Sequence, residues 1–324
     1  KLTINLNNKC TCAFYIRHTG TGGYINWGPI EINDAYDESG VTETEVSGMY
    51  IQGSYTQITI NDAIIDGIDR QNSGGTCKGI SITDATGEVT LNSPQVSNVL
   101  CTGFTTDADG IGVFGKIRVA GATNVYDERA GMLAINNPII TDCQGRSIKT
   151  QMSRSVIRQP VINRKLIVAF GTSDIDHQIG GHHVIENPYF RYLLNGATAP
   201  VPADWFSISV QVRCEDMPNH FEIRGGVLMS ECPQYYYSFL TYGNTTDDAA
   251  SYNANPKNST VIFDGVHVQG IGVLAGLPVF TRNFCEFNMG RLQTNTNSHN
   301  LTLQIVRANL AGLALLSYSS GAAA

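Results

Sequence analysis

The stretch Leu133-Ala-Ile-Asn-Asn-Pro-Ile-Ile140 carries the local pattern that decides the fold of this chain. Apolar residues stand before a polar Asn-Asn-Pro step, and two more follow it. Because proline lacks a backbone N–H, such a step fits a bend between two strands, where the missing donor does little harm. The stretch therefore predicts two short strands of one coil, joined by a sharp bend.

This pattern recurs along the chain. Close copies are Ile58–Ile65, Val89–Val96, Val156–Ile162 and Val184–Phe190, and looser copies are Phe221–Leu228 and Val261–Val268. The proline or small residue of the bend stands at positions 63, 94, 138, 160, 188, 226 and 265. The repeat is therefore as short as 22 residues, from 138 to 160, and as long as 44, from 94 to 138.

A repeat with a short minimum length and an irregular number of extra residues is typical of a solenoid in which some coils extrude loops. We therefore predict an all-β fold, a right-handed parallel β-helix with loop excursions. The competing fold is a compact β-sandwich, whose strands should follow one another at shorter and more even spacing.

A second repeated pattern lies after the bends in the sequence. Four segments align on an isoleucine: Gly110–Phe114, Ser147–Gln151, Asp174–Gln178 and Ser207–Gln211. Side chains alternate along a strand, so each isoleucine and the residue two further on should point into the core. The expected inward residues are Ile111, Ile148, Ile175 and Ile208, with Val113, Thr150, His177 and Val210. The expected outward residues are Lys149, Asp174 and Asp176, with the column Gln151, Gln178 and Gln211. The glutamines of this column either form a stabilising amide ladder or bind a ligand.

The repeats divide the chain into three parts. We expect an N-terminal capping segment (1–56), the β-helix itself (57–305) and a C-terminal tail or cap (306–324). The chain opens at Lys1 in strand-like sequence, with no initiating Met and no signal peptide, so we expect that a piece upstream has been removed. The most apolar run, Leu310–Leu316, is too short for a membrane span and is broken by glycine.

Composition narrows the function classes. Of the 324 residues only 15% are charged, the net charge is −7, and there are 33 glycines, which suits a β protein with many turns. A negative chain lacks the basic field that nucleic acid requires, so we expect no nucleic-acid partner. The eight cysteines are too sparse for a disulfide framework, and Cys10 and Cys12 have no partners at zinc-site spacing. We expect small buried thiols and neither a metal nor a cofactor.

Three segments carry a family resemblance. Asp107–Gly115, Asp142–Gln151 and Asp174–Gly181, in this order and spacing, resemble the central coils of bacteriophage tailspike depolymerases, which have pectate-lyase-like β-helices. The resemblance covers residues 57 to 230, and the rest only by periodicity. It implies a homotrimeric spike of the phage virion that binds a bacterial surface polysaccharide (capsule, exopolysaccharide or O-antigen) and usually cleaves it. It also implies attachment to the virion through an N-terminal part that is not recognisable in this sequence.

Glycosidic hydrolysis needs two carboxyl groups, one to protonate the leaving oxygen and one to activate water or attack directly. Asp174 and Asp176 are two residues apart on a predicted strand, so they lie on one face with Cα atoms about 7 Å apart. Asp107 and Asp109 form a second pair, for which a turn ending in glycine is the alternative interpretation. These four aspartates are the candidate catalytic residues.

Basic and aromatic residues supply candidates for substrate binding. The segment 146–165 holds six basic residues and no acid: Arg146, Lys149, Arg154, Arg158, Arg164 and Lys165. It could hold acidic sugars through charge-assisted hydrogen bonds, or it could be a solvated face paired with acids of neighbouring coils. Trp205 follows a proline-rich excursion and could stack on a sugar ring. The candidate substrate-binding residues are Arg146, Lys149, Gln151, Gln178, Gln211 and Trp205. His177 is expected to be a core histidine.

Three functions remain open at this point. The leading hypothesis is a depolymerase that acts by hydrolysis. The second is a polysaccharide lyase, in which a base removes the proton beside a uronate while Lys149, Arg146 or a cation neutralises the carboxylate. The third is a receptor-binding spike without catalytic activity.

Overall fold

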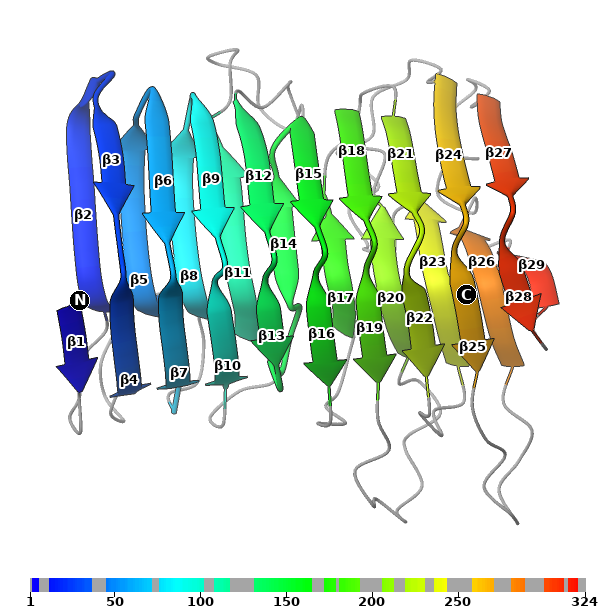
Figure 1. The fold of residues 1–324 in the computed structure, drawn as a ribbon, viewed down its shortest axis with the longest axis horizontal. Coiled ribbons are helices and arrows are strands. Elements are labelled where there is room, and N and C mark those ends of the chain that lie inside the picture. The colour runs from blue at the N-terminus through cyan, green and yellow to red at the C-terminus, as the bar shows by residue number, and fades with distance from the viewer. Residues whose placement is uncertain are drawn as a thin grey trace, which may run out of the picture.

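The computed structural model is an elongated stack of short strands (Figure 1). It describes residues 2–5, 12–36, 45–71, 76–101, 108–116, 131–164, 172–178, 181–192, 206–212, 219–230, 236–243, 258–270, 281–288, 300–311 and 314–319. Within these ranges the chain forms strands and turns and no helix, and hence no helix that could cross a membrane.

The strands form three sheets, all of them parallel. Sheet A contains β1 (Leu2–Asn5), β4 (Ile30–Tyr36), β7 (Ala63–Asp69), β10 (Gln95–Leu100), β13 (Ile139–Thr141), β16 (Val161–Arg164), β19 (Tyr189–Tyr192), β22 (Val227–Ser230), β25 (His267–Gly270) and β28 (Asn309–Ala311). Sheet B contains β2 (Cys12–Thr21), β5 (Glu45–Ser54), β8 (Thr76–Ala85), β11 (Ala108–Gly115), β14 (Ile148–Gln151), β17 (Thr172–His177), β20 (Phe206–Val212), β23 (Tyr236–Gly243), β26 (Thr281–Asn288) and β29 (Ala314–Ser319). Sheet C contains β3 (Tyr24–Trp27), β6 (Gln57–Asn61), β9 (Glu88–Asn92), β12 (Met132–Asn136), β15 (Arg154–Arg158), β18 (Gly181–Glu186), β21 (Asn219–Arg224), β24 (Asn258–Asp264) and β27 (Asn300–Val306).

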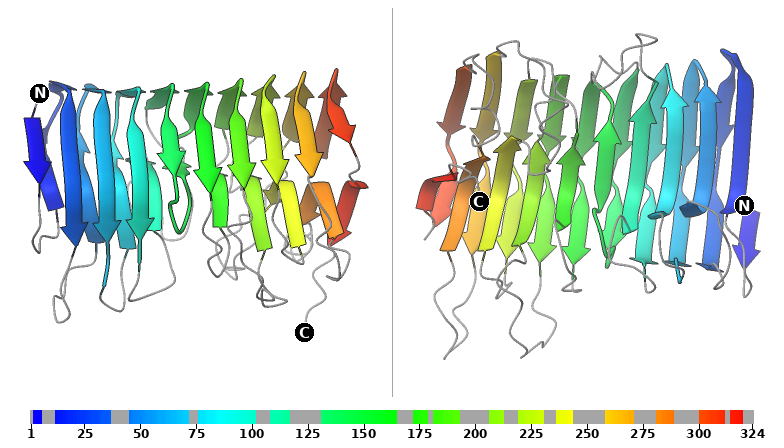
Figure 2. Two further views of the ribbon diagram at one scale, coloured as in Figure 1. Left: turned by 60° about the horizontal axis from the view of Figure 1, so that its bottom comes forward. Right: turned by 180° about the vertical axis from the view of Figure 1, so that it is seen from behind.

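Each coil runs from a strand of sheet B through sheet C to sheet A, and every third strand pairs with its counterpart in the next coil. Sheets A and C lie in front in Figure 1, and sheet B is seen from behind in Figure 2. The predicted right-handed parallel β-helix is confirmed. Strands β1 to β5 and β27 to β29 belong to the same three sheets as the central coils.

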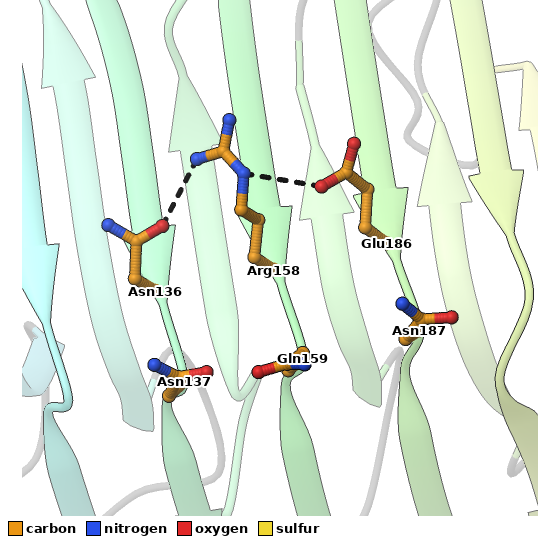
Figure 3. A pocket seen from close by; sticks show the side chains of 6 residues that line it. All are labelled: Asn136, Asn137, Arg158, Gln159, Glu186 and Asn187. Atoms are coloured by element: carbon orange, nitrogen blue, oxygen red, sulfur yellow. Dashed lines mark hydrogen bonds and ion pairs between the residues drawn. The ribbon is translucent and has the colours of Figure 1, made fainter.

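The bend between sheets C and A has the form that the Asn-Pro steps predict. Asn137, Gln159 and Asn187 stand at this bend with positive φ angles of 52°, 50° and 50°, each just before a proline. Their backbone N–H groups donate to a carbonyl of the next coil; the Asn137 bond, to Arg158, is 2.8 Å long. Figure 3 shows the three bends side by side, one per coil. The bend residue with a positive φ therefore turns the chain, and its N–H also hydrogen-bonds to the next coil.

The predicted core register is confirmed in three coils and wrong in the fourth. Ile111, Ile148 and Ile175 face one another in β11, β14 and β17 and are fully buried. Opposite Ile175, however, β20 places Val210, and Ile208 pairs with Ser173. A shift of two residues keeps every side chain on its face, so the inward pattern of the sequence does not exclude it. The correction puts Gln211 opposite Asp176 instead of Gln178.

Three of the four cysteines whose side chains the structure describes are buried, as expected: Cys77, Cys101 and Cys143. Cys12 is half-buried, and none of these four forms a disulfide. Burial raises the pKa of the Cys143 thiol to about 12, although the nearby Arg164 lowers it.

Candidate functional site

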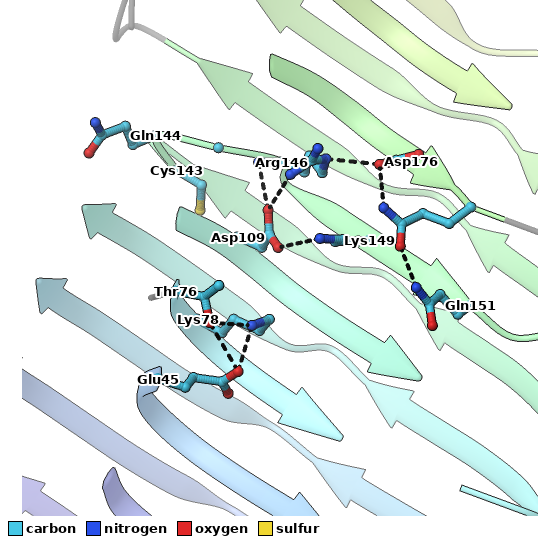
Figure 4. A network of polar contacts seen from close by, with 12 residues as sticks. Glu45, Thr76, Lys78, Asp109, Cys143, Gln144, Arg146, Lys149, Gln151 and Asp176 are labelled. Carbon is cyan, nitrogen blue, oxygen red and sulfur yellow. Dashed lines mark hydrogen bonds and ion pairs between the residues drawn. The ribbon is translucent and has the colours of Figure 1, made fainter. Parts of the chain in front are cut away.

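A cluster of charged and amide side chains crosses β11, β14 and β17 on the face of sheet B that points away from the core (Figure 4). We call it the polar cluster, and its members are Asp109, Arg146, Lys149, Gln151, Asp176 and Gln178. It joins residues from three successive coils.

Two glycines let the coils of the cluster come this close. A Cβ on Gly145 would lie 2.8 to 3.0 Å from backbone atoms of Ala108, and a Cβ on Gly110 would lie 2.7 Å from the carbonyl oxygen of Ser147. Only glycine fits such approaches without a shift of the backbone. The Gly145 N–H donates to the Ala108 carbonyl at 2.7 Å, which fixes the turn that precedes Arg146.

Arg146 connects the two carboxylates of the cluster. Its Nε lies 2.8 Å from Oδ2 of Asp176, its Nη1 lies 3.7 Å from Oδ1 of Asp109, and its backbone N–H donates to the same Asp109 oxygen at 3.1 Å. Both carboxylate side chains are 0% exposed, whereas 15% of the Arg146 side chain is exposed. The guanidinium therefore lies between two buried anions and is itself reached by water.

Lys149 supplies a second cation beside Asp109. Its Nζ lies 3.9 Å from Oδ2 of Asp109 and 6.0 Å from the centre of the Phe114 ring, and the ammonium of Lys78 lies 5.8 Å from the same ring. An ammonium at this distance is attracted by the ring if it lies over the face. Position 112 is glycine, and a Cβ there would lie within 3 Å of both Lys78 and Phe114.

The glutamines continue the cluster as an amide chain. Gln178 donates from Nε2 to Oδ2 of Asp176 at 3.3 Å, and Gln151 donates to Oε1 of Gln178 at 2.7 Å. Two members of the predicted glutamine column thus form the amide ladder. The third member, Gln211, lies opposite Asp176, and the structure describes its backbone only.

Arg164 holds the turn that presents Arg146. Its guanidinium is almost fully buried and donates to the carbonyl oxygens of Cys143, Gln144 and Gly145. Asp174 lies 3.5 Å from the same guanidinium. Asp174 therefore belongs to this clamp.

The structure brings together residues that the sequence assigned to different pairs. Asp109 and Asp176 come from separate coils and share Arg146, although the sequence paired each with its neighbour two positions away. The expectation that Asp174 and Asp176 face solvent is wrong, since they are 3% and 0% exposed. Arg164 of the preceding coil contacts Asp174, and Arg146 of the same preceding coil and Gln178 contact Asp176. Asp107 and Trp205 lie outside the described residues, so their roles stay predictions.

Four residues of the basic segment lie within 4 Å of acids on neighbouring coils, as one of its two interpretations expected, and sugar binding by the segment stays a prediction. Besides the pairs of Arg146 and Arg164, Arg158 lies 3.2 Å from Glu186 in the next coil. Lys165 lies outside the described residues.

The sequence analysis did not predict one further set of polar contacts, on the neighbouring strands β5 and β8. Lys78 lies 2.6 Å from Glu45, and Thr76 donates to the same carboxylate at 3.2 Å. Burial raises the pKa of Glu45, but the Lys78 ammonium outweighs this and leaves the pKa below its usual value. Glu45 lies opposite Thr76 and two residues from the partner of Lys78 in the pairing of β5 with β8, a relationship between coils that no pattern in the sequence displays.

His177 lies in the core directly behind the cluster, as expected. It is fully buried, its ring centre lies 4.4 Å from that of His183, and no residue that the structure describes hydrogen-bonds to either of its nitrogens. Burial, helped by His183, lowers the pKa of His177 well below its usual value.

In the described part of the chain, no group of three or more His, Cys, Asp or Glu side chains is placed to hold a metal ion. Comparison with known proteins finds no match among protein-family models, curated proteins or solved structures.

Proposed function

We propose that this chain is part of a bacteriophage tailspike that binds a bacterial surface polysaccharide and hydrolyses it at the polar cluster. The observation that carries the proposal is the meeting of Asp109 and Asp176, from different coils, at one guanidinium. Two neighbouring carboxyl groups are the minimum that glycosidic hydrolysis requires. The resemblance of three central segments to tailspike depolymerases supports the same activity.

The exposed groups of the cluster indicate the order of events. Arg146 and Lys149 are its water-accessible members among those that carry charge, with 15% and 11% of their side chains exposed. An incoming polysaccharide therefore meets two cations first, which favours a chain with acidic sugars. When Arg146 turns to the sugar, Asp109 and Asp176 are released from it. One of the two carboxylates takes up a proton from water and, as a carboxylic acid, donates it to the glycosidic oxygen. The other takes a proton from the attacking water or attacks the sugar itself.

Asp109→Asn and Asp176→Asn test the proposal. Each variant should fold and lose on the order of 10²-fold or more in rate, because an amide cannot transfer the proton. The substrate is a panel of purified capsular polysaccharides, exopolysaccharides and O-antigens, and new reducing ends are measured. Glu88→Gln, which changes an exposed carboxylate of β9 on sheet C, is the matched control and should keep full activity. Near-native rates in both aspartate variants would remove the cluster from the mechanism.

A non-catalytic receptor-binding spike is the second candidate. The observation that favours it is the complete burial of both carboxylates in ion pairs, which is also what a purely structural cluster would display. Product analysis separates the candidates. A hydrolase releases reducing ends, a lyase also creates an unsaturated sugar that absorbs ultraviolet light, and a receptor-binding spike does neither.

The proposal includes a homotrimer carried on the phage virion and acting at the bacterial cell surface. β-Helix spikes of this kind resemble three-fold bundles, and closed cyclic symmetry is common among homo-oligomers. Sedimentation at micromolar concentration should report three chains. A monomer under these conditions would contradict this part of the proposal.

A further inference from the structure

A second polar feature lies at the corner between sheets C and A, away from the polar cluster. It is an open pocket of about 300 Å³, formed where three successive coils pass from one sheet to the other (Figure 3). It is lined by Asn136, Asn137, Arg158, Gln159, Glu186 and Asn187. We call it the corner pocket.

One side of the corner pocket is a closed ladder of polar contacts. Arg158 donates from Nη1 to Oδ1 of Asn136 at 3.1 Å, and its Nε lies 3.2 Å from Glu186. Arg224 of the following coil donates to the other oxygen of Glu186 at 3.3 Å. The charges of Arg158 and Glu186 therefore cancel, and the pocket presents no excess of either sign.

The other side carries amides that are not engaged. Asn137, Gln159 and Asn187 are exposed bend residues, and their side chains make no hydrogen bond with any described residue. Adjacent coils of a parallel sheet are about 4.8 Å apart, so the three amides form an evenly spaced row. Each amide offers both donors and an acceptor.

The backbone at Gln159 adds an independent observation. A positive φ of 50° is uncommon for residues other than glycine, and asparagine tolerates it better than glutamine does. The equivalent bend residues two and three coils after Gln159 are Gly225 and Gly265. A long amide thus occupies a strained position that glycine would fill at lower cost, which points to a role for the side chain.

We propose that the corner pocket binds a neutral, polyhydroxylated sugar chain, separately from any cleavage at the polar cluster. A regular row of free donors and acceptors suits successive hydroxyl groups, and the balanced charges give no reason to select an anion. Ile139 and Tyr189, two positions beyond the bends, are 44% and 39% exposed and offer apolar surface for the C–H faces of sugars. The protein then holds a neutral glycan at a corner that is remote from the site proposed for hydrolysis.

The test substitutes glycine at the bends. Gln159→Gly and Asn187→Gly remove an amide and relieve the positive φ, so the midpoint of thermal unfolding should stay the same or rise. Binding to an array of neutral and acidic bacterial oligosaccharides should fall at least tenfold, and only for neutral glycans. Ser93→Gly is the matched control, since Ser93 has the same φ of 50° at a bend outside the pocket. It should leave binding unchanged.

Three results would overturn the proposal: no neutral glycan bound by the unaltered protein, equal losses in all three variants, or binding retained in both pocket variants. A change of sedimentation in the pocket variants alone would assign the corner to contacts between subunits instead. Failure here and failure of the proposed hydrolysis are distinguishable. Gln159→Gly should still release reducing ends from short oligosaccharides, whereas Asp109→Asn should not.

Discussion

The Nε atom of Arg146 lies 2.8 Å from the carboxylate of Asp176, which belongs to the next coil. The same guanidinium reaches back to Asp109 of the preceding coil. Three coils that are distant in sequence therefore share one ion-paired centre. Since Arg146 contacts both Asp109 and Asp176, a substitution of Arg146 should affect both carboxylates.

Arg146→Lys should disable the cluster while keeping its charge. A lysine ammonium is a point charge without the planar fork, so it cannot contact both carboxylates in the way that a guanidinium does. We expect the rate of reducing-end release to fall on the order of 10²-fold, measured at a temperature at which the variant is folded. The thermal midpoint should fall as well, because one buried carboxylate loses its partner. Arg154→Lys, at an exposed position of β15, is the control. Equal rates in the two variants would show that the fork of Arg146 is not used.

Asp174→Asn should weaken the fold instead of the chemistry. The carboxylate lies 3.5 Å from Arg164, and both side chains are almost fully buried. Removing one partner of a buried pair leaves an uncompensated charge, at a cost of about 3–5 kcal/mol in the free energy of unfolding. Urea unfolding measures this cost. Glu186→Gln breaks a more exposed pair and should cost less than about 1 kcal/mol. A similar small loss for Asp174→Asn would contradict the clamp.

The repeat predicts the fold because stacking is local. An Asn-Pro bend and a core isoleucine recur in each coil, and both properties are visible in a single strand. The cluster is different, since it joins Asp109 to Asp176 across 67 positions. Which residues meet across coils depends on register, and a shift of two residues, as at Ile208, leaves the apolar pattern unchanged.

The burial of Asp174 and Asp176 was also not predictable, because it too depends on contacts between coils. Alternation along a strand gives the face on which Asp176 lies, but not what covers that face. The turn 143–145 brings Arg146 over the strand, and its glycine approaches Ala108 too closely for any other residue. Such a contact between coils has no periodic signature in the sequence.

Thiol reactivity should report the stability of the coil that carries Arg146. Because burial raises the pKa of Cys143 to about 12, its thiolate fraction at pH 8 is on the order of 10⁻⁴. Iodoacetamide should therefore label Cys143 far more slowly in the folded protein than in urea, as followed by mass spectrometry of its peptide. The half-buried Cys12 is the internal comparison and should be labelled first. Labelling of Cys143 at its unfolded rate would mean that the turn opens readily.

Acid should destabilise the protein through His177. The ring lies in the core, and its nitrogens have no hydrogen-bond partner in the described part of the chain. It packs against Phe221 and beside His183, whose Nδ1 lies 2.9 Å from Oγ of Ser155. Burial holds the pKa of folded His177 well below the value of 6.5 that it has when exposed. As the pH falls below 6.5, the unfolded chain therefore binds a proton that the folded chain does not. The contribution to stability is complete above that pH and is lost below it, at up to about 1.4 kcal/mol per pH unit.

His177→Val isolates this effect, because the inward row through Val113, Thr150 and His177 already accepts a valine. The variant should lose less stability than the unaltered protein between pH 6.5 and pH 4.5 in urea unfolding series. His220→Asn, which changes a partly exposed histidine, should keep the steeper loss because it leaves the core unchanged. Parallel pH curves for the unaltered protein and His177→Val would mean that other groups cause the acid sensitivity. A flatter curve for His177→Val alone would tie the acid sensitivity of the fold to the core directly behind Asp176.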